Sequence, residues 1–152
     1  MKRRLSEDGL TCSTVRGVGF EFLWHISNVA QLLQTKLPVT SEWIEAGGLV
    51  CELLLQPYAT ISHPSGLDTV GLMFSALDGR DGRNLPATVR FQVVNARNPA
   101  SCSTVDEGRG VLRVGRSTWA AEELISVAAL VDSAAGFVVG DRLTIRVEAR
   151  YL

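Results

Sequence analysis

The clearest pattern in the chain is a regular alternation of apolar and polar side chains close to its C-terminal end. Over residues 142–151 every second side chain is apolar or aromatic, namely Leu143, Ile145, Val147, Ala149 and Tyr151. A period of two is typical of a β-strand with one buried face and one hydrated face. A strand of a parallel sheet, covered on both faces, would instead be a continuous apolar run. The pattern therefore predicts an antiparallel sheet.

Comparable segments recur along the chain between turns rich in glycine, proline and polar residues. They predict strands over residues 18–26, 42–46, 49–56, 69–76, 88–95, 111–114 and 142–151. The apolar positions of these strands predict one shared core, made of Phe22, Trp24, Ile44, Leu53, Leu55, Leu72, Phe91, Val93, Leu143, Ile145 and Val147. Because the strands follow one another without helices of ordinary length between them, we expect an all-β, antiparallel two-layer β-sandwich.

Two short segments and the N-terminal region do not follow the strand pattern. Residues 28–33 predict a single helical turn, and residues 119–126 predict one or two more. Residues 1–17 mix charges, serine, threonine and glycine without periodicity, which is typical of a flexible tail. We therefore expect a tail over residues 1–17 and a single domain over residues 18–152.

The composition narrows the class of protein and of partner. The 152 residues are 46% hydrophobic and 20% charged, which is an ordinary balance for one folded core. The formal net charge is −1 and no segment is strongly basic, so a phosphate backbone has little to bind and we expect no nucleic-acid partner. No apolar run is long enough to span a bilayer, so we expect no membrane partner.

The cysteines indicate the redox compartment. Cys12, Cys51 and Cys102 are odd in number and widely spaced, and the first four residues are not followed by an apolar signal segment. We therefore predict no native disulfide and a stability that does not depend on reductant. The same features predict an intracellular location, cytoplasmic or nuclear.

Candidate catalytic and metal-binding residues are few and scattered. His25 alternates with apolar residues and is expected on the hydrated face of its strand, while His63 lies in a loop rich in proline and serine. Cys51 is interpreted as a small buried side chain and Cys102 as a loop thiol. Residues 78–84 contain two aspartates but lack the alternating acidic ligands of a calcium loop. We predict no catalytic group, no metal and no other cofactor in this chain.

Six features follow one another in a particular order along the chain. They are an aromatic strand at 22–29, a glycine hairpin with a strand ending in proline at 45–57, two strands at 70–74 and 91–95, Trp119, and the closing segment 136–145. Together they resemble the meprin and TRAF homology (MATH) domain, also called the TRAF-like domain, and look nearest to the version in a ubiquitin-specific protease. The resemblance implies an eight-stranded antiparallel sandwich that binds short extended peptides.

The resemblance also implies a peptide groove beside Trp119. When the chain is aligned with the family on Trp119 and Asn95, the groove positions carry Met73, Val89, Val111, Trp119 and Ala121. Relatives often have larger aromatic residues there, so this groove is expected to be shallow and aliphatic. Val50 and Ala120 stand where the family usually has tryptophan and glycine. The peptide preference of a relative therefore does not carry over to this chain.

The resemblance places the ligand contacts between positions 111 and 121. The backbone of residues 117–121, including Ala120, is expected to pair with the ligand, with hydroxyl groups offered by Ser117 and Thr118. Arg113 or Arg116, if directed toward the groove, would favour Ser, Asp or Glu in the ligand. Ala121 is expected at the surface. Trp119 keeps two interpretations, as a core residue or as a groove-lining residue that also packs inward.

The leading functional hypothesis is a non-enzymatic module that binds short linear motifs of other proteins, for adaptor or substrate docking in the ubiquitin pathway or in signalling. One alternative is the substrate-docking domain of a larger ubiquitin-specific protease or ubiquitin ligase, with the catalytic machinery outside these residues. The other is a purely structural β-sandwich. Residues 1–17 lack the heptads of trimer-forming relatives, so a monomer is expected.

Overall fold

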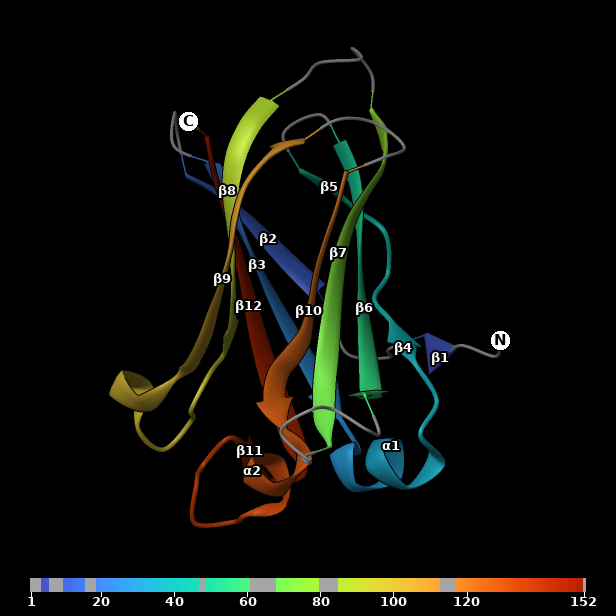
Figure 1. Ribbon diagram of the computed structural model, residues 1–152, viewed down its shortest axis with the longest axis vertical. Helices are drawn as coiled ribbons and strands as arrows, with labels where there is room; N and C mark the ends of the chain where they lie inside the picture. The colour runs from blue at the N-terminus through green and yellow to red at the C-terminus, as the bar shows by residue number, and fades with distance from the viewer. Residues whose placement is uncertain are drawn as a thin grey trace.

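The computed structural model describes residues 4–5, 10–15, 19–46, 49–60, 68–79, 85–112 and 117–151, which form two β-sheets packed face to face (Figure 1). Sheet A has the strand order β1 (Arg4–Leu5), β4 (Val39–Thr40), β6 (Leu49–Thr60), β7 (Thr69–Gly79) and β10 (Ser117–Ser126), and β5 (Ile44–Ala46) also pairs with β6. Sheet B has the order β2 (Leu10–Val15), β3 (Gly19–Ser27), β12 (Arg142–Tyr151), β8 (Leu85–Val93) and β9 (Ser103–Leu112), and β11 (Val138–Val139) also pairs with β12.

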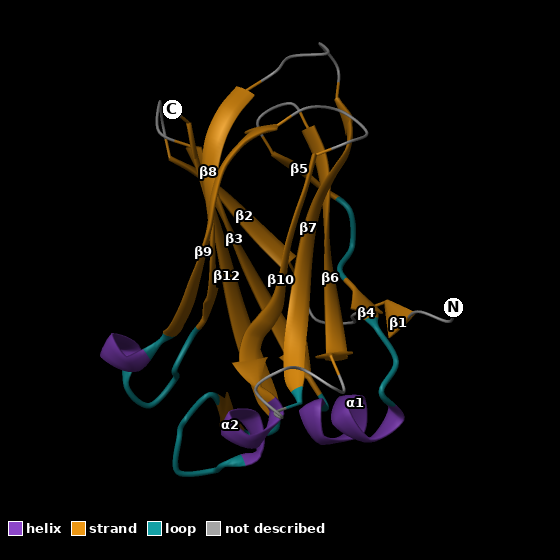
Figure 2. Cartoon of the chain, viewed as in Figure 1, coloured by secondary structure: helices purple, strands orange, loops and turns teal. Residues whose placement is uncertain are grey.

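The pairing pattern confirms the predicted all-β antiparallel sandwich. Every strand pair in the described residues is antiparallel except the short parallel pair of β1 and β4. The strands of six residues or more in this part of the chain are β2, β3, β6, β7, β8, β9, β10 and β12. Helices α1 (Val29–Thr35) and α2 (Val127–Val131) lie at the same end of the sandwich (Figure 2). A 3₁₀ turn, η1 (Pro99–Ser101), precedes β9.

The hydrophobic core lies between the two sheets and matches the prediction closely. Ten of the eleven predicted core residues are buried, and the exception, Ile44, is partly buried and packs against the others. A row of aromatic rings crosses this core from one sheet to the other. Phe20 and Phe22 of sheet B are 5.2 Å apart between ring centroids, and Phe22 is 5.5 Å from Phe74 of sheet A. These contacts add directional packing to the burial of apolar surface.

Strand β10 occupies the segment in which helical turns had been predicted over residues 119–126, and that prediction is wrong. Trp119 lies opposite Phe74 of β7 in the ladder, and their ring centroids are 5.8 Å apart. Pairing with β7 and burial of apolar side chains override the weak helical preference of the local sequence. The helix begins only at Val127, where the Ser126 hydroxyl accepts a 3.1 Å hydrogen bond from the Ala129 backbone N–H.

The expectation that residues 1–17 form a tail outside the core is wrong for Leu10–Val15. This segment is strand β2, which pairs along β3 from Leu10 opposite Trp24 to Val15 opposite Gly19. The Leu10 side chain is buried, and its backbone N–H donates a 3.2 Å hydrogen bond to Glu42 Oε1. An edge strand this short contains too few alternating positions to stand out in the sequence, and its neighbour β3 supplies the stabilising contacts.

Strand β9 was predicted only in part. The sequence favoured a short strand over residues 111–114, whereas the structure has β9 over Ser103–Leu112. Its register against β8 shifts between Val89 and Arg90 of the partner strand. A bulge of this kind interrupts the period of two, so residues 103–110, which are mostly polar and include two glycines, resemble a loop.

Candidate functional site

Strand β10 lies at one edge of sheet A. In the described residues it pairs with β7 on one side only, and no ladder joins it to β9, the edge strand of sheet B on the same side of the sandwich (Figure 1). The two edges are linked by a side chain: the Ser103 hydroxyl donates a 3.3 Å hydrogen bond to the Leu124 carbonyl oxygen. An edge strand presents backbone N–H and C=O groups that can pair with another chain.

The side chains of β10 alternate between the core and solvent. Trp119 and Ala121 point inward and are 8% and 5% exposed, whereas Ala120 between them is exposed. Across the ladder, Ala120 lies opposite Met73 of β7, and Met73 in turn lies opposite Leu54 of β6. Met73 is 36% exposed. An apolar row therefore crosses the outer face of sheet A.

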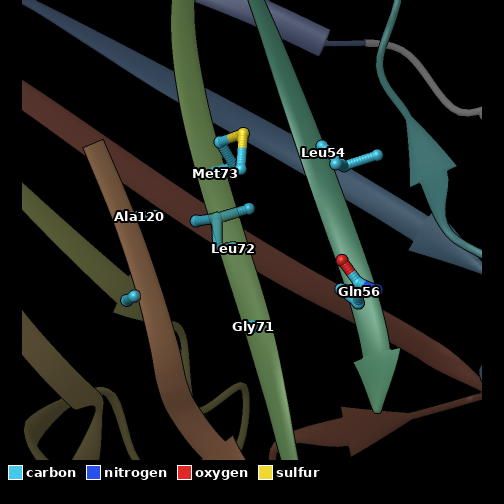
Figure 3. Close-up of a pocket in the computed structure, with 7 residues that line it drawn as sticks. Leu54, Gln56, Gly71, Leu72, Met73 and Ala120 are labelled. Carbon is cyan, nitrogen blue, oxygen red and sulfur yellow. The ribbon is translucent and has the colours of Figure 1, made fainter. Parts of the chain in front are cut away.

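A pocket opens on this outer face, spans three strands and has a volume of about 130 Å³ (Figure 3). We call it the sheet A pocket, and its lining residues are Leu54, Gln56, Gly71, Leu72, Met73, Ala120 and Ala121. Gly71 lies opposite Gln56 in the ladder and has no side chain, and Ala120 has only a methyl group. The pocket exists because these two positions are small while Leu54 and Met73 rise beside them.

The family comparison agrees with this fold. The family model of the MATH domain matches residues 21–149. The chain belongs to the MATH domain family. MATH domains are non-catalytic folds that mediate protein–protein interactions. The match is to the family as a whole, so a closer kinship with ubiquitin-specific proteases is not supported. No curated protein is similar enough to match this MATH domain.

The residues predicted to line a single groove are divided between the outer face of sheet A and the core of the MATH domain. Met73 and Ala120 lie on the outer face of sheet A, where they line the sheet A pocket. Val89 is 2% exposed in β8 of sheet B and belongs to the core with Trp119 and Ala121, although Ala121 also lines the sheet A pocket. The expectation that Ala121 lies at the surface is wrong, because the Trp119 ring packs on Phe74 and the strand alternation then turns Ala121, two residues on, inward as well.

For the remaining predicted contact residues, the structure either gives the backbone pairing alone or does not describe the residue. Val111 lies in β9 opposite Pro86, and Ser117 and Thr118 open β10 opposite Ala76 and Ser75. Arg113 and Arg116 lie outside the described residues, so the predicted preference for Ser, Asp or Glu in the ligand stays a prediction.

Four lining residues of the sheet A pocket were not predicted as site residues, namely Leu54, Gln56, Gly71 and Leu72, the last of which was predicted only in the core. Leu54 had a detectable signal, because it stands in the run Leu53-Leu54-Leu55 of a strand whose other apolar positions alternate. Since Leu53 and Leu55 are buried, Leu54 must point to the opposite face. Leu54 becomes informative because it joins Met73 and Ala120 in one apolar row, and a contiguous exposed apolar patch marks a candidate binding surface.

The groups with potential catalytic chemistry do not gather in one place. His25 faces outward from sheet B, where its Nδ1 lies 2.9 Å from the Thr144 hydroxyl oxygen, and His63 lies outside the described residues. Asp78 lies opposite Val50 in the β6–β7 ladder, and Asp81 is not among the described residues. Across the described ranges, no group of three His, Cys, Asp or Glu side chains could hold a metal ion, and no helix is long and apolar enough to cross a membrane.

The three cysteines are free thiols in different surroundings. Cys51 is 1% exposed in β6, and this burial, with a smaller contribution from Cys12, raises the pKa of its thiol to about 12. Burial also raises the pKa of Cys12. The Cys102 thiol donates to the Pro99 carbonyl oxygen at 3.1 Å and accepts from the Asn95 N–H at 3.4 Å. Raised pKa values disfavour the thiolate, so Cys51 and Cys12 are poor nucleophiles.

We expect the stability of the domain to fall as pH rises from about 9 to about 12, in part because of Cys51. In the unfolded chain this thiol ionises near its ordinary pKa of 9.0, whereas in the folded chain its pKa is about 12. Folding therefore favours the neutral thiol. The resulting contribution to stability is fully present below pH 9 and is lost as pH rises from there through the folded-state pKa of Cys51. Denaturant unfolding at stepped pH should show a shallower decline for Cys51→Ala than for the parent. Equal declines would mean that Cys51 is not buried.

Proposed function

We propose that this MATH domain binds short extended segments of other proteins along the open edge of β10, with ligand side chains lying on the outer face of sheet A. The observation that carries the proposal is the apolar pocket beside β10, a strand that within the described residues forms a ladder with β7 on one side only. The ligand adds a strand to the sheet, so main-chain hydrogen bonds supply affinity and the pocket supplies specificity. Any catalytic step belongs to another protein or to another part of a longer one.

Such a site has a small contact area and a modest affinity. A single extended segment that pairs with one strand and fills one small pocket buries little surface, and we expect a dissociation constant in the micromolar range, about −8 kcal/mol. The proposed cellular role is adaptor or substrate docking in the ubiquitin pathway or in signalling, at an intracellular site. A weak and reversible contact suits this role, and avidity would come from multivalent partners.

The strand pairing can be tested on the ligand backbone. A peptide is selected from a random library against the purified chain and then synthesised as a series with one backbone nitrogen methylated at a time. Because alternate N–H groups of an added strand face its neighbour, we expect a loss of roughly threefold to tenfold at every second residue and little effect between them. Isothermal titration calorimetry measures each affinity.

A loss without this periodicity would contradict pairing with β10. A library that yields no bound peptide at all would favour a purely structural sandwich instead. The control is a variant of the domain itself, Ser13→Arg. It changes an exposed position on β2, the edge strand of the other sheet. This variant should bind the selected peptide as tightly as the parent does.

A further inference from the structure

Trp43 is the most exposed of the large hydrophobic side chains in the described residues. It is 69% exposed, although an indole ring is among the side chains with most apolar surface to bury. It lies just before β5, which pairs with β6 on the side of sheet A away from β10 (Figure 1). The surface around Trp43 is therefore separated from β10 by strands β6 and β7.

The segment that carries Trp43 is held against β6 on both sides. Before it, the Ser41 N–H donates to the Leu53 carbonyl oxygen at 2.8 Å, and the Ser41 hydroxyl accepts from the Leu53 N–H at 2.9 Å. After it, Ile44 lies opposite Cys51 in the β5–β6 ladder and packs against the core. Trp43 therefore stands between two fixed points of the sheet, next to a residue that faces inward.

The Trp43 indole is itself held by a hydrogen bond. Its Nε1–H donates to Glu52 Oε2 at 2.7 Å, a short distance that is typical of a charged acceptor. Glu52 stands between the buried residues Cys51 and Leu53, so its side chain is on the outer face of sheet A. The bond fixes one edge of the ring and leaves most of the ring exposed. A side chain ordered in advance loses little conformational entropy when a partner binds it.

Two carboxylates lie on the outer face beside this ring. Glu45, two residues after Trp43, is exposed and lies opposite Val50. Glu52 is two residues further along β6, and diagonal neighbours in such a ladder are about 7–8 Å apart. The charged residues of strands β4, β5, β6, β7 and β10 are all acidic, namely Glu45, Glu52, Asp78, Glu122 and Glu123. The charge of these strands therefore favours a cationic partner group.

An exposed indole beside carboxylates fits a guanidinium group best. A cation within about 6 Å of the face of an aromatic ring is attracted by the ring quadrupole, most strongly for tryptophan. A guanidinium is flat and can stack on the ring while its fork of N–H groups donates to a carboxylate, whereas an ammonium is compact and more strongly hydrated. The indole uses one of about four acceptor positions of the Glu52 carboxylate, so Glu52 can hold the indole and accept from a guanidinium together.

We propose that Trp43, Glu45 and Glu52, which we call the Trp43 site, bind an arginine side chain of a partner protein. The guanidinium stacks on the indole and donates hydrogen bonds to the carboxylates. The site is a second docking point of the domain, on the far side of sheet A from the segment proposed to pair with β10, and it does not rest on that proposal. A single stacked arginine binds weakly, so the Trp43 site adds specificity within a larger contact.

The test follows the Trp43 indole signal of the ¹⁵N-labelled full chain by nuclear magnetic resonance. Trp43→Ala identifies the signal, because it removes one of three indole signals. The probe is the blocked peptide acetyl-Gly-Arg-Gly-amide, with lysine and citrulline versions as controls, since citrulline has nearly the shape of arginine without its charge. We expect a saturable shift with a dissociation constant in the millimolar range, roughly threefold weaker binding of the lysine peptide, and no saturable shift with citrulline.

Two glutamate variants separate the Trp43 site from the general charge of the sheet. Glu52→Gln keeps an acceptor for the indole and removes the charge, so it should weaken binding of the arginine peptide by about threefold to tenfold. Glu123→Gln removes the same charge from an exposed position of β10 and should leave that affinity unchanged.

The proposal is overturned if the arginine peptide gives no shift, if citrulline reproduces the shift, or if both glutamate variants weaken binding equally. The outcome for β10 is separate. A library-selected peptide that pairs with β10 should bind Trp43→Ala as tightly as the parent, so a failure of the Trp43 site leaves the proposed function standing.

Discussion

Replacing Phe91 with alanine is expected to lower the free energy of unfolding by about 3–5 kcal/mol. Phe91 is 0% exposed in β8 of sheet B, where it lies opposite Val147 of β12 and Val105 of β9. The loss combines the transfer free energy of the ring with the cost of the cavity that its removal leaves in the core. Because single domains are stable by only about 5–15 kcal/mol, the variant should be marginally folded or unfolded at 37 °C.

Chemical denaturation followed by tryptophan fluorescence measures this change. Phe91→Leu is the graded control, since it keeps an apolar side chain and should lose clearly less stability than the alanine variant. A melting temperature unchanged by Phe91→Ala would show that the core does not lie between the two sheets as the structure has it.

Arginine at two adjacent positions of β10 is expected to have opposite consequences. Ala121→Arg places a charge at a site that is 5% exposed, within a packed core. A buried charge without a partner costs about 3–5 kcal/mol, and the added volume costs more, so this variant should unfold. Ala120→Arg places the same side chain on the outer face, where Ala120 is exposed. This variant should fold normally, and its side chain should lie over the sheet A pocket.

The functional result of Ala120→Arg is a loss of peptide binding of at least tenfold at unchanged thermal stability. The reason is steric, because the guanidinium stem would occupy the path between the ligand and Met73. Ser13→Arg, at the edge of sheet B, controls for the added charge and should bind normally. A folded Ala120→Arg variant that binds a selected peptide as tightly as the parent would move the binding surface away from sheet A. A folded Ala121→Arg variant would show that β10 is turned the other way.

The regular alternation in the chain was sufficient to predict most of the sandwich. Strands β3, β6, β7, β8 and β12 each contain several apolar positions at a spacing of two, and all were predicted within a few residues of their observed bounds. Among the strands of six residues or more, those that were missed or shortened have two physical causes. β2 is a short edge strand, and β9 and β10 both contain register shifts that break the alternation. Their strand conformation comes from pairing with neighbours rather than from local sequence.

The sequence by itself determined the fold class, the family and most of the core, because burial of one face per strand leaves a period that can be read locally. It also grouped Met73 and Ala120 with the residues around Trp119. Only the tertiary structure decided which of these side chains face solvent. A period of two shows which residues share a face, but the choice between inward and outward depends on the sheet that packs opposite. Here that choice is made by the Trp119 ring on Phe74, which leaves Ala120 and Met73 outside.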